Sequence, residues 1–212
     1  MKENRGYRME TDQEKFWEGE FGEKYIDRNI DLALLSSNIS FFSKVLSTMG
    51  GVKSILELGC NAGMNLKAIK NLNKDIALTG VDINKKALSE VDKWGGATTI
   101  VSSILDLNVE AKYDLTFTKG VMIHINPEFL EIVYSNLYDL SKKYILVAEY
   151  YNPKPVSIDY HGYQDRLFKR DFAGEMLDKY SNLSLIDYGF LYHRDPVFPQ
   201  DDINWFLLRK NT

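Results

Sequence analysis

The sequence predicts an α/β fold in which a mostly parallel sheet carries helices on both faces. Three observations predict it: strand-like apolar runs alternate with helical patterns, a glycine-containing turn joins a strand directly to a helix, and no repeat or low-complexity linker interrupts the alternation. Strands that alternate with helices form parallel sheets, because the connecting helices pack back onto the faces of the sheet. A chain of 212 residues has the length of about one domain, and we assign residues 1–212 to a single domain.

The strand-like runs define the predicted sheet. Helical patterns lie between these runs, and the third helix has the clearest start. The side chain of Asn126 caps it, and Pro127 takes the first helical position, where its missing N–H is not needed. The last two runs suit a hairpin, since Pro196 and Pro199 lie in the turn-rich stretch between them. The predicted strands are 54–58, 76–81, 97–101, 113–118, 143–148, 184–191 and 202–208, and the predicted helices are 63–73, 84–93, 127–141 and 168–180.

An N-terminal region precedes the sheet. Residues 16–29 combine aromatic side chains with Arg28 and two glycines, and a further helix is predicted from about Asn38 to Met49. An amphipathic cap over the sheet edge explains the aromatic residues but explains Arg28 less well. We therefore interpret residues 1–50 as an N-terminal helical lid on a core of residues 51–212.

The segment from Glu57 to Gly63 is the most informative part of the chain. An apolar strand ends in Glu57, and the chain then turns over Gly59 and Gly63 into a helix. Such a turn brings backbone N–H groups and a helix N-terminus close to a nucleotide-like ligand. Asp82 closes the next strand, at the distance where an acid takes a pair of ribose hydroxyls. Glu57 also suits a cofactor with an ammonium group and repels a diphosphate.

Composition excludes several other classes. The net charge is -4, no Lys/Arg-rich run is present, and a nucleic-acid partner is therefore not favoured. A single cysteine, Cys60, forms no internal disulfide, and three scattered histidines give no metal-binding cluster. We find no apolar signal region and no span long enough for a membrane helix, so a cytoplasmic protein without a membrane partner is expected. The oligomeric state stays open.

The turn resembles the signature of class I S-adenosylmethionine-dependent methyltransferases, an acid-x-Gly-x-Gly-x-Gly loop after the first strand, with Asn61 in place of the middle glycine. The resemblance implies a Rossmann-like, seven-stranded sheet with helices on both faces, whose final hairpin places an antiparallel strand within the sheet. It also implies S-adenosyl-L-methionine as the cofactor. The cofactor-binding residues that it implies are Tyr25, Arg28, Glu57, Gly59, Asn61, Gly63, Asp82, Ile83, Ser103, Ile104 and Lys119.

Two groups among these residues have more specific expected roles. In related methyltransferases a lid carries a Tyr and an Arg that reach the methionine carboxylate, and Tyr25 and Arg28 look suited to this. Arginine donates two parallel hydrogen bonds to a carboxylate, although Arg28 has a surface salt bridge as its alternative role. Ser103 is expected to hydrogen-bond the edge of the adenine ring while Ile104 packs on its face. Many relatives have an acid at the Ser103 position.

The catalytic candidates are His124, Glu149 and Tyr151, which follow strands at the edge where ligands bind in open α/β sheets. His124 is matched to proton transfer near neutral pH, but its apolar neighbours also suit a buried structural histidine. Glu149 is a second candidate base, or it orients an acceptor hydroxyl or amine. Tyr150 and Tyr151 are expected to wall the pocket, where an aromatic face attracts a sulfonium cation, or simply to pack.

At closer range the chain resembles the pseudaminic acid biosynthesis-associated methylases. The likeness rests on residues 16–29, 58–65, 120–125, 149–153 and 163–168, which together span most of the chain. It implies an acceptor that is an anionic sugar acid or a nucleotide-activated sugar of surface-glycan biosynthesis. The expected substrate-binding residues are Trp17, Tyr150, His161, Arg166 and Arg194.

The sequence therefore predicts methyl transfer from S-adenosylmethionine to an oxygen or nitrogen of a small acceptor. A carboxylate or phosphate on that acceptor would bind arginine through charge-assisted hydrogen bonds. Two alternatives stay open, because a fold does not fix a function. The first is an enzyme that uses S-adenosylmethionine in a non-methylating reaction or methylates another small metabolite. The second is a non-catalytic protein that retains the cofactor pocket.

Overall fold

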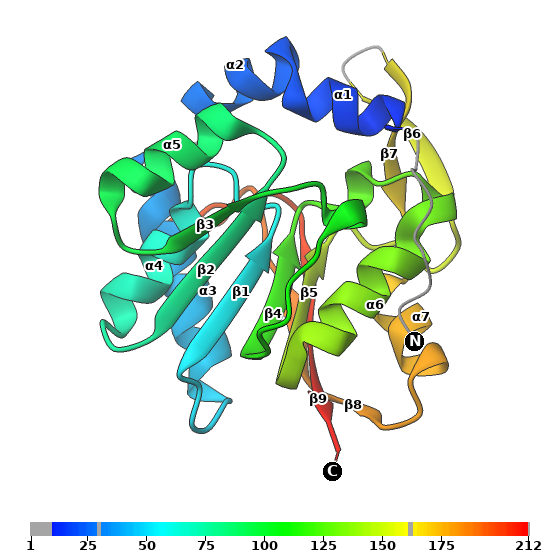
Figure 1. Ribbon diagram of the computed structural model, residues 1–212. Coiled ribbons are helices and arrows are strands. Elements are labelled where there is room, and N and C mark those ends of the chain that lie inside the picture. The colour runs from blue at the N-terminus through cyan, green and yellow to red at the C-terminus, as the bar shows by residue number, and fades with distance from the viewer. Residues whose placement is uncertain (1–9, 29–30, 161–162, 212) are drawn as a thin grey trace.

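A seven-stranded sheet forms the centre of the computed structural model, which describes residues 10–28, 31–160 and 163–211 (Figure 1). The first five strands along the chain pair in parallel, whereas β9 runs antiparallel to both β5 and β8. The predicted fold class is confirmed, including the antiparallel strand within the sheet. In spatial order the strands are β3 (Thr98–Val101), β2 (Ala77–Asp82), β1 (Ser54–Leu58), β4 (Tyr113–Lys119), β5 (Ser141–Glu149), β9 (Asn204–Lys210) and β8 (Leu183–Phe190).

Successive residues of the central strands enter two separate cores, one on each face of the sheet. Ile55 and Leu146 lie in the first core, and their neighbours Leu56 and Ile145 lie in the second. This alternation follows from the two-residue period of a β-strand. The helices of the first face are α3 (Leu32–Ser47), α4 (Met64–Leu72) and α5 (Lys85–Trp94), and those of the second are α6 (Leu130–Leu140) and α7 (Phe172–Lys179).

Two short helices, α1 (Asp12–Glu18) and α2 (Glu20–Arg28), lie across the carboxyl ends of the strands (Figure 1). A capping box fixes the start of α1. The Thr11 Oγ1 accepts a hydrogen bond from the backbone N of Glu14 at 3.1 Å, and the Glu14 Oε2 accepts one from the backbone N of Thr11 at 2.7 Å. Both groups satisfy N–H donors that have no partner inside a helix. We call α1 and α2 the lid; α3 falls within the predicted lid of residues 1–50 but packs on the first face of the sheet.

Two predicted helix boundaries are wrong, and local capping explains both. Helix α3 begins six residues before the predicted start at Asn38, because the Asp31 Oδ1 accepts a hydrogen bond from the backbone N of Ala33 at 3.1 Å. Helix α7 begins after the predicted position 168, because Asp171 caps it through a 2.8 Å bond from the backbone N of Gly174. The predicted cap at Asn126 is confirmed by a 3.1 Å bond from the backbone N of Glu128.

A second, two-stranded sheet forms from β6 (Val156–Tyr160) and β7 (Tyr163–Lys169), where sequence analysis predicts no strand. Its residues Ile158 and Leu167 are paired across the hairpin, and β7 packs beside the segment Met122–His124. Apolar residues alternate with polar ones in β6, a pattern typical of a strand. None of the helices in the described ranges is long and apolar enough to cross a membrane.

Candidate functional site

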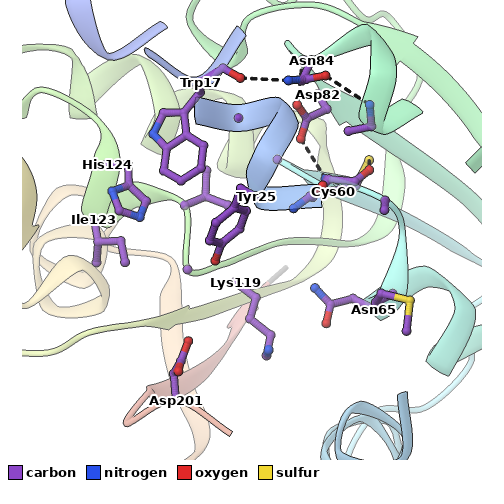
Figure 2. A pocket seen from close by; sticks show the side chains of 18 of the residues that line it. Trp17, Tyr25, Cys60, Asn65, Asp82, Asn84, Lys119, Ile123, His124 and Asp201 are labelled. Carbon is purple, nitrogen blue, oxygen red and sulfur yellow. Dashed lines mark hydrogen bonds between the residues drawn. The ribbon is translucent and has the colours of Figure 1, made fainter. Parts of the chain in front are cut away.

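A cavity of about 760 Å³ lies at the carboxyl ends of the strands, under the lid. Its size is within the range of small-molecule and cofactor sites. Figure 2 shows side chains that reach it from the lid, from the loops after β1, β2 and β4, and from the loop between β8 and β9. The predicted residues that line it are Trp17, Tyr25, Gly59, Asn61, Asp82, Ile83, Ser103, Ile104, Lys119, His124 and Tyr150.

The turn after β1 is held in a left-handed backbone conformation. Gly59, Asn61 and Gly63 have φ values of 78°, 46° and 74°, which glycine adopts freely and asparagine tolerates. A Cβ atom on Gly59 would lie 2.6 Å from the Val121 Cγ2, so no larger residue fits there without displacing the loop after β4. Gly63 does not line the cavity but shapes the entry into α4.

Asp82 at the end of β2 connects this turn to the next loop. Its Oδ2 accepts a hydrogen bond from the backbone N of Asn61, and its Oδ1 accepts one from the backbone N of Asn84, both at 2.8 Å. Burial raises the pKa of the Asp82 carboxyl, although the backbone hydrogen bonds act in the opposite direction. Asn84 in turn donates from Nδ2 to the backbone oxygen of Trp17 at 3.0 Å (Figure 2). Asp82 thus orders the loops at the floor of the cavity, and Asn84 connects them to the lid.

Glu57 lies beneath the cavity and does not line it. Its side chain is 1% exposed, and its Oε1 accepts a 2.6 Å hydrogen bond from the Asn65 Nδ2, while its Oε2 has no partner among the described residues. Burial raises the pKa of Glu57 to about 8, and the hydrogen bond from Asn65 and the charge of Lys119 oppose this rise. Burial also lowers the pKa of Lys119, whose side chain projects into the cavity.

A lid residue reaches the loop after β3. The Ser103 hydroxyl donates a hydrogen bond to the Glu14 Oε1, and it accepts one from the backbone N of Leu105 at 3.1 Å. The adjacent Ile104 is fixed by its backbone oxygen, which accepts a 2.6 Å hydrogen bond from the Asn136 Nδ2. Sequence analysis did not identify Glu14 as a site residue, because its distance from position 103 along the chain gives no signal of the contact.

His124 lies against the lid on the other side of the cavity. Its ring centroid is 4.7 Å from that of Trp17, and the Trp17 ring packs edge-on to Tyr25 at 5.2 Å (Figure 2). The His124 side chain is 8% exposed and lines the cavity. Buried and facing the cavity, it has the position that either a structural histidine or a proton acceptor requires.

Comparison with known proteins agrees with this geometry. The family described as a methyltransferase domain matches residues 55–143. The magnesium protoporphyrin IX methyltransferase of Synechocystis PCC 6803, solved with S-adenosylhomocysteine, aligns over 94% of this chain and 100% of its own, with 13% identity and a TM-score of 0.67. A methyltransferase domain thus spans residues 55–143, and the fold around it is that of the class I methyltransferases.

Two further solved structures share the class I fold of the methyltransferase. The 1,6-didemethyltoxoflavin-N1-methyltransferase of Burkholderia thailandensis aligns over 90% of this chain and 84% of its own, with 14% identity and a TM-score of 0.65. The plantazolicin methyltransferase BpumL aligns over 94% of both chains, with 17% identity and a TM-score of 0.65. A search of the curated proteins found no match.

Two predicted catalytic residues of the methyltransferase do not line the cavity. The Glu149 carboxylate accepts hydrogen bonds from the backbone N of Val121 at 3.0 and 3.1 Å and from that of Ile123 at 3.4 Å. Burial raises the pKa of Glu149 to about 7, against the effect of these bonds. Glu149 therefore orders the loop that carries His124. Tyr151 is 37% exposed and packs toward Phe206, with ring centroids 5.9 Å apart.

The predicted substrate-binding residues fall into three groups. Trp17 and Tyr150 line the cavity of the methyltransferase, whereas Arg194 is exposed and lies outside the lining. Its neighbour His193 lines the cavity instead, and the His193 Nδ1 lies 2.8 Å from the Asp202 Oδ1. The predictions for His161 and for the side chains of Arg28 and Arg166 lie outside the described residues.

Buried amides of α3 and of the β8–β9 loop form a wall of the cavity that sequence analysis missed. Asn38 is 1% exposed and Gln200 is 7% exposed. The Gln200 Nε2 donates to the backbone oxygen of Ser37 at 2.9 Å, which fixes its Oε1 as an acceptor. Neither the Asn38 Oδ1 nor the Gln200 Oε1 has a partner in the described part of the chain. Asn38 stands among several serines in 32–47, so its local sequence gives no signal of a place at the cavity.

Proposed function

We propose that the methyltransferase acts on an oxygen or nitrogen of a small, hydroxyl-rich acceptor, a nonulosonic acid or a nucleotide-activated sugar of surface-glycan biosynthesis. The observation that carries this proposal is the wall formed by Asn38 and Gln200, whose buried amide oxygens have no partner among the described residues. A buried acceptor without a hydrogen bond is costly, so such a wall favours a ligand that donates hydrogen bonds. Sugar hydroxyls are donors of this kind.

A cation in the cavity is consistent with an anionic sugar. Lys119 is a cavity cation near Asp201, and it offers a partner for a carboxylate or phosphate. The predicted contributions of Arg166 and His161 would add to it, and these rest on the sequence resemblance. Arg194 is exposed and outside the lining, which makes it a rim contact in this proposal.

The cofactor proposal assigns the opposite end of the cavity to S-adenosylmethionine. Each Asp82 oxygen accepts one backbone bond and keeps a further lone pair for a ribose hydroxyl. Glu57 lies beneath the floor of the cavity, and it keeps its proposed role at the ammonium group because its buried Oε2 has no partner among the described residues. A Cβ atom on Gly120 would meet no atom of the described residues within 4 Å, apart from its chain neighbours, so the space above β4 is open to a ligand. Tyr25 and Arg28 keep their proposed role at the methionine carboxylate.

The turn after β1 and the loops after β2 and β3 complete this proposed cofactor site. Gly59, Asn61 and Gly63 shape the turn, Ile83 follows the ribose acid, and Ser103 and Ile104 border the adenine. The fit is favourable because the polar groups converge on one cavity, at the carboxyl ends of the strands, where open α/β sheets bind ligands.

In this proposal the main task of the protein is to align the acceptor atom with the methyl group of the cofactor. S-adenosylmethionine supplies a methyl group that its sulfonium charge has already activated. His124 is the proposed proton acceptor, because it is the candidate base that lines the cavity, and Glu149 is a positioning residue that holds its loop. Trp17 and Tyr150 exclude water and position the acceptor.

The test measures methyl transfer to defined sugars. Purified protein is incubated with S-adenosylmethionine and either N-acetylneuraminic acid or its cytidine monophosphate conjugate. The expected result is a sugar product with one added methyl group and an equal amount of S-adenosylhomocysteine. Absence of methylated sugar from both, with a methylated product from another class of metabolite, would refute the sugar assignment.

A variant pair tests the amide wall itself. Asn38→Leu removes the hydrogen-bonding groups and keeps the branched shape of the side chain, and we expect the acceptor KM to rise at least about tenfold while the affinity for S-adenosylhomocysteine is retained. The matched control is Asn71→Leu on the exposed side of α4. An equal loss of both affinities would show that Asn38 supports the fold and not the acceptor.

A further inference from the structure

The lid carries a buried carboxylate to the part of the cavity that we assign to adenine. Glu14 lines the cavity and is 7% exposed, and it stands beside Ser103 and Ile104, which belong to the loop after β3. Figure 1 shows that α1, which bears Glu14, crosses above the sheet from a distant part of the chain. Two separate segments therefore form this end of the cavity.

The hydrogen-bonding capacity of Ser103 is largely used within the protein. Its hydroxyl has one proton, which it donates to Glu14, and it accepts a bond from the backbone N of Leu105. Ser103 therefore has no proton left for the purine ring. For a donor on that ring, the adjacent Glu14 carboxylate is a stronger acceptor than the remaining lone pair of the Ser103 hydroxyl, because a hydrogen bond to an ionised group is stronger than one to a neutral group.

The Glu14 carboxylate is also fixed in place before any ligand binds. Its Oε2 accepts bonds from the backbone N and from the Oγ1 of Thr11, at 2.7 and 2.8 Å. Its Oε1 is oriented toward the loop after β3 by the bond from Ser103. A preorganised acceptor discriminates between ligands more strongly than a mobile one, since little ordering cost is left at binding.

We propose that Glu14 recognises the 6-amino group of the cofactor's adenine, so that the lid, and not the sheet, supplies the purine-specific contact. This inference rests on the proposed placement of adenine at Ser103 and Ile104. A 6-oxo purine would place its carbonyl oxygen, which carries no proton, against the Glu14 carboxylate, so these two oxygens would repel each other. The enzyme therefore rejects the 6-oxo cofactor analogue.

The first test uses the unaltered protein. Isothermal titration calorimetry compares S-adenosylhomocysteine with S-inosylhomocysteine, whose purine has a 6-oxo group and a proton on N1 where adenine has a 6-amino group and an unprotonated N1. A lost charge-assisted hydrogen bond predicts weaker binding of the 6-oxo ligand by about tenfold to a hundredfold. Equal affinities for the two ligands would overturn the proposal, whatever the behaviour of any variant. Sugar methylation is not measured here, so the result is independent of the proposed acceptor.

Variants separate recognition from support of the lid. Glu14→Gln presents an amide that can turn its N–H toward a 6-oxo group, and the ratio of the two affinities should fall to near one or invert. Thr11→Ala loosens the same carboxylate without removing it, and Glu18→Gln is an exposed control on α1. Both should keep the preference of the unaltered protein for the 6-amino ligand. If Glu14→Gln weakened both ligands equally and kept that preference, Glu14 would only hold the lid, and the proposal would fail.

Discussion

Replacing Glu57 with glutamine should make the stability of the methyltransferase less dependent on pH. The Glu57 carboxyl is buried, and its pKa is raised from 4.5 to about 8. At a pH between these two pKa values, the Glu57 carboxyl is ionised in the unfolded chain and protonated in the folded chain. Folding then takes up a proton, so the free energy of unfolding falls as pH rises from about 4.5 to about 8 and levels off above that.

The size of this effect follows from the separation of the two pKa values. One pKa unit corresponds to about 1.4 kcal/mol, which gives a destabilisation of about 5 kcal/mol once Glu57 is ionised in both states. Roughly 3 kcal/mol of it develops between pH 5 and pH 8. Glutamine carries no proton equilibrium and can still accept the bond from the Asn65 Nδ2. Glu57→Gln should therefore gain about 3 kcal/mol relative to the unaltered protein over this interval.

Urea unfolding at a series of pH values, without added ligand, measures the difference. Glu149 is present in both proteins and contributes the same slope to each, so subtraction isolates Glu57. Glu128→Gln, at an exposed site, is the control and should follow the unaltered protein at every pH. Parallel stability curves for Glu57→Gln and the unaltered protein would refute the reasoning, because they would mean that Glu57 titrates alike in the folded and unfolded states.

Three other substitutions test local structure. Gly59→Ala forces a Cβ against Val121 at a positive φ, and urea unfolding should show a loss of about 1–3 kcal/mol; unchanged stability would mean that the loop after β4 yields freely. Asp114→Ala removes the carboxylate that accepts hydrogen bonds from the backbone N and Oγ of Ser54 at the start of β1. The free energy of unfolding, measured by thermal denaturation, should fall by about 1–3 kcal/mol. An unchanged free energy of unfolding would show that water replaces the carboxylate. Glu149→Gln leaves backbone donors of the His124 loop without a full set of acceptors, and hydrogen exchange of the amides of 121–123 should accelerate several-fold; unchanged protection would contradict its positioning role.

The fold was predictable because its signals are local. Each of β1 to β5 is a short segment that contains several apolar or β-branched residues, and the turn at Gly59 is marked by residues that a left-handed backbone requires. The β6–β7 hairpin was missed because its segment contains many polar and charged residues, which resemble those of a solvated connection. Helix α3 was started too late because its first turn depends on a single capping contact of Asp31.

The candidate site was predictable where the contact follows from position at a strand end. Asp82 and Lys119 both close strands, and both line the cavity. Glu57 also lies near the end of its strand, but the pleat of β1 and the hydrogen bond from the Asn65 side chain place it below the floor of the cavity. Glu14 and Gln200 were missed because they approach from the lid and from a loop, and tertiary packing alone brings them to the cavity.

The loop between β8 and β9 can change without disturbing the sheet. A 2.8 Å hydrogen bond from the backbone N of Leu191 to the backbone oxygen of Ile203 closes its base, and the strands on both sides are paired along their length. Within it, Gln200 and Asp201 face the cavity at the wall opposite Asp82. The free energy of closing a loop grows slowly with its length. An insertion or an exchanged segment between residues 192 and 202 would therefore alter one wall of the cavity while the β1–α4 turn stays intact, which makes this loop the natural place to graft a new acceptor preference onto an unchanged methyl-donor site.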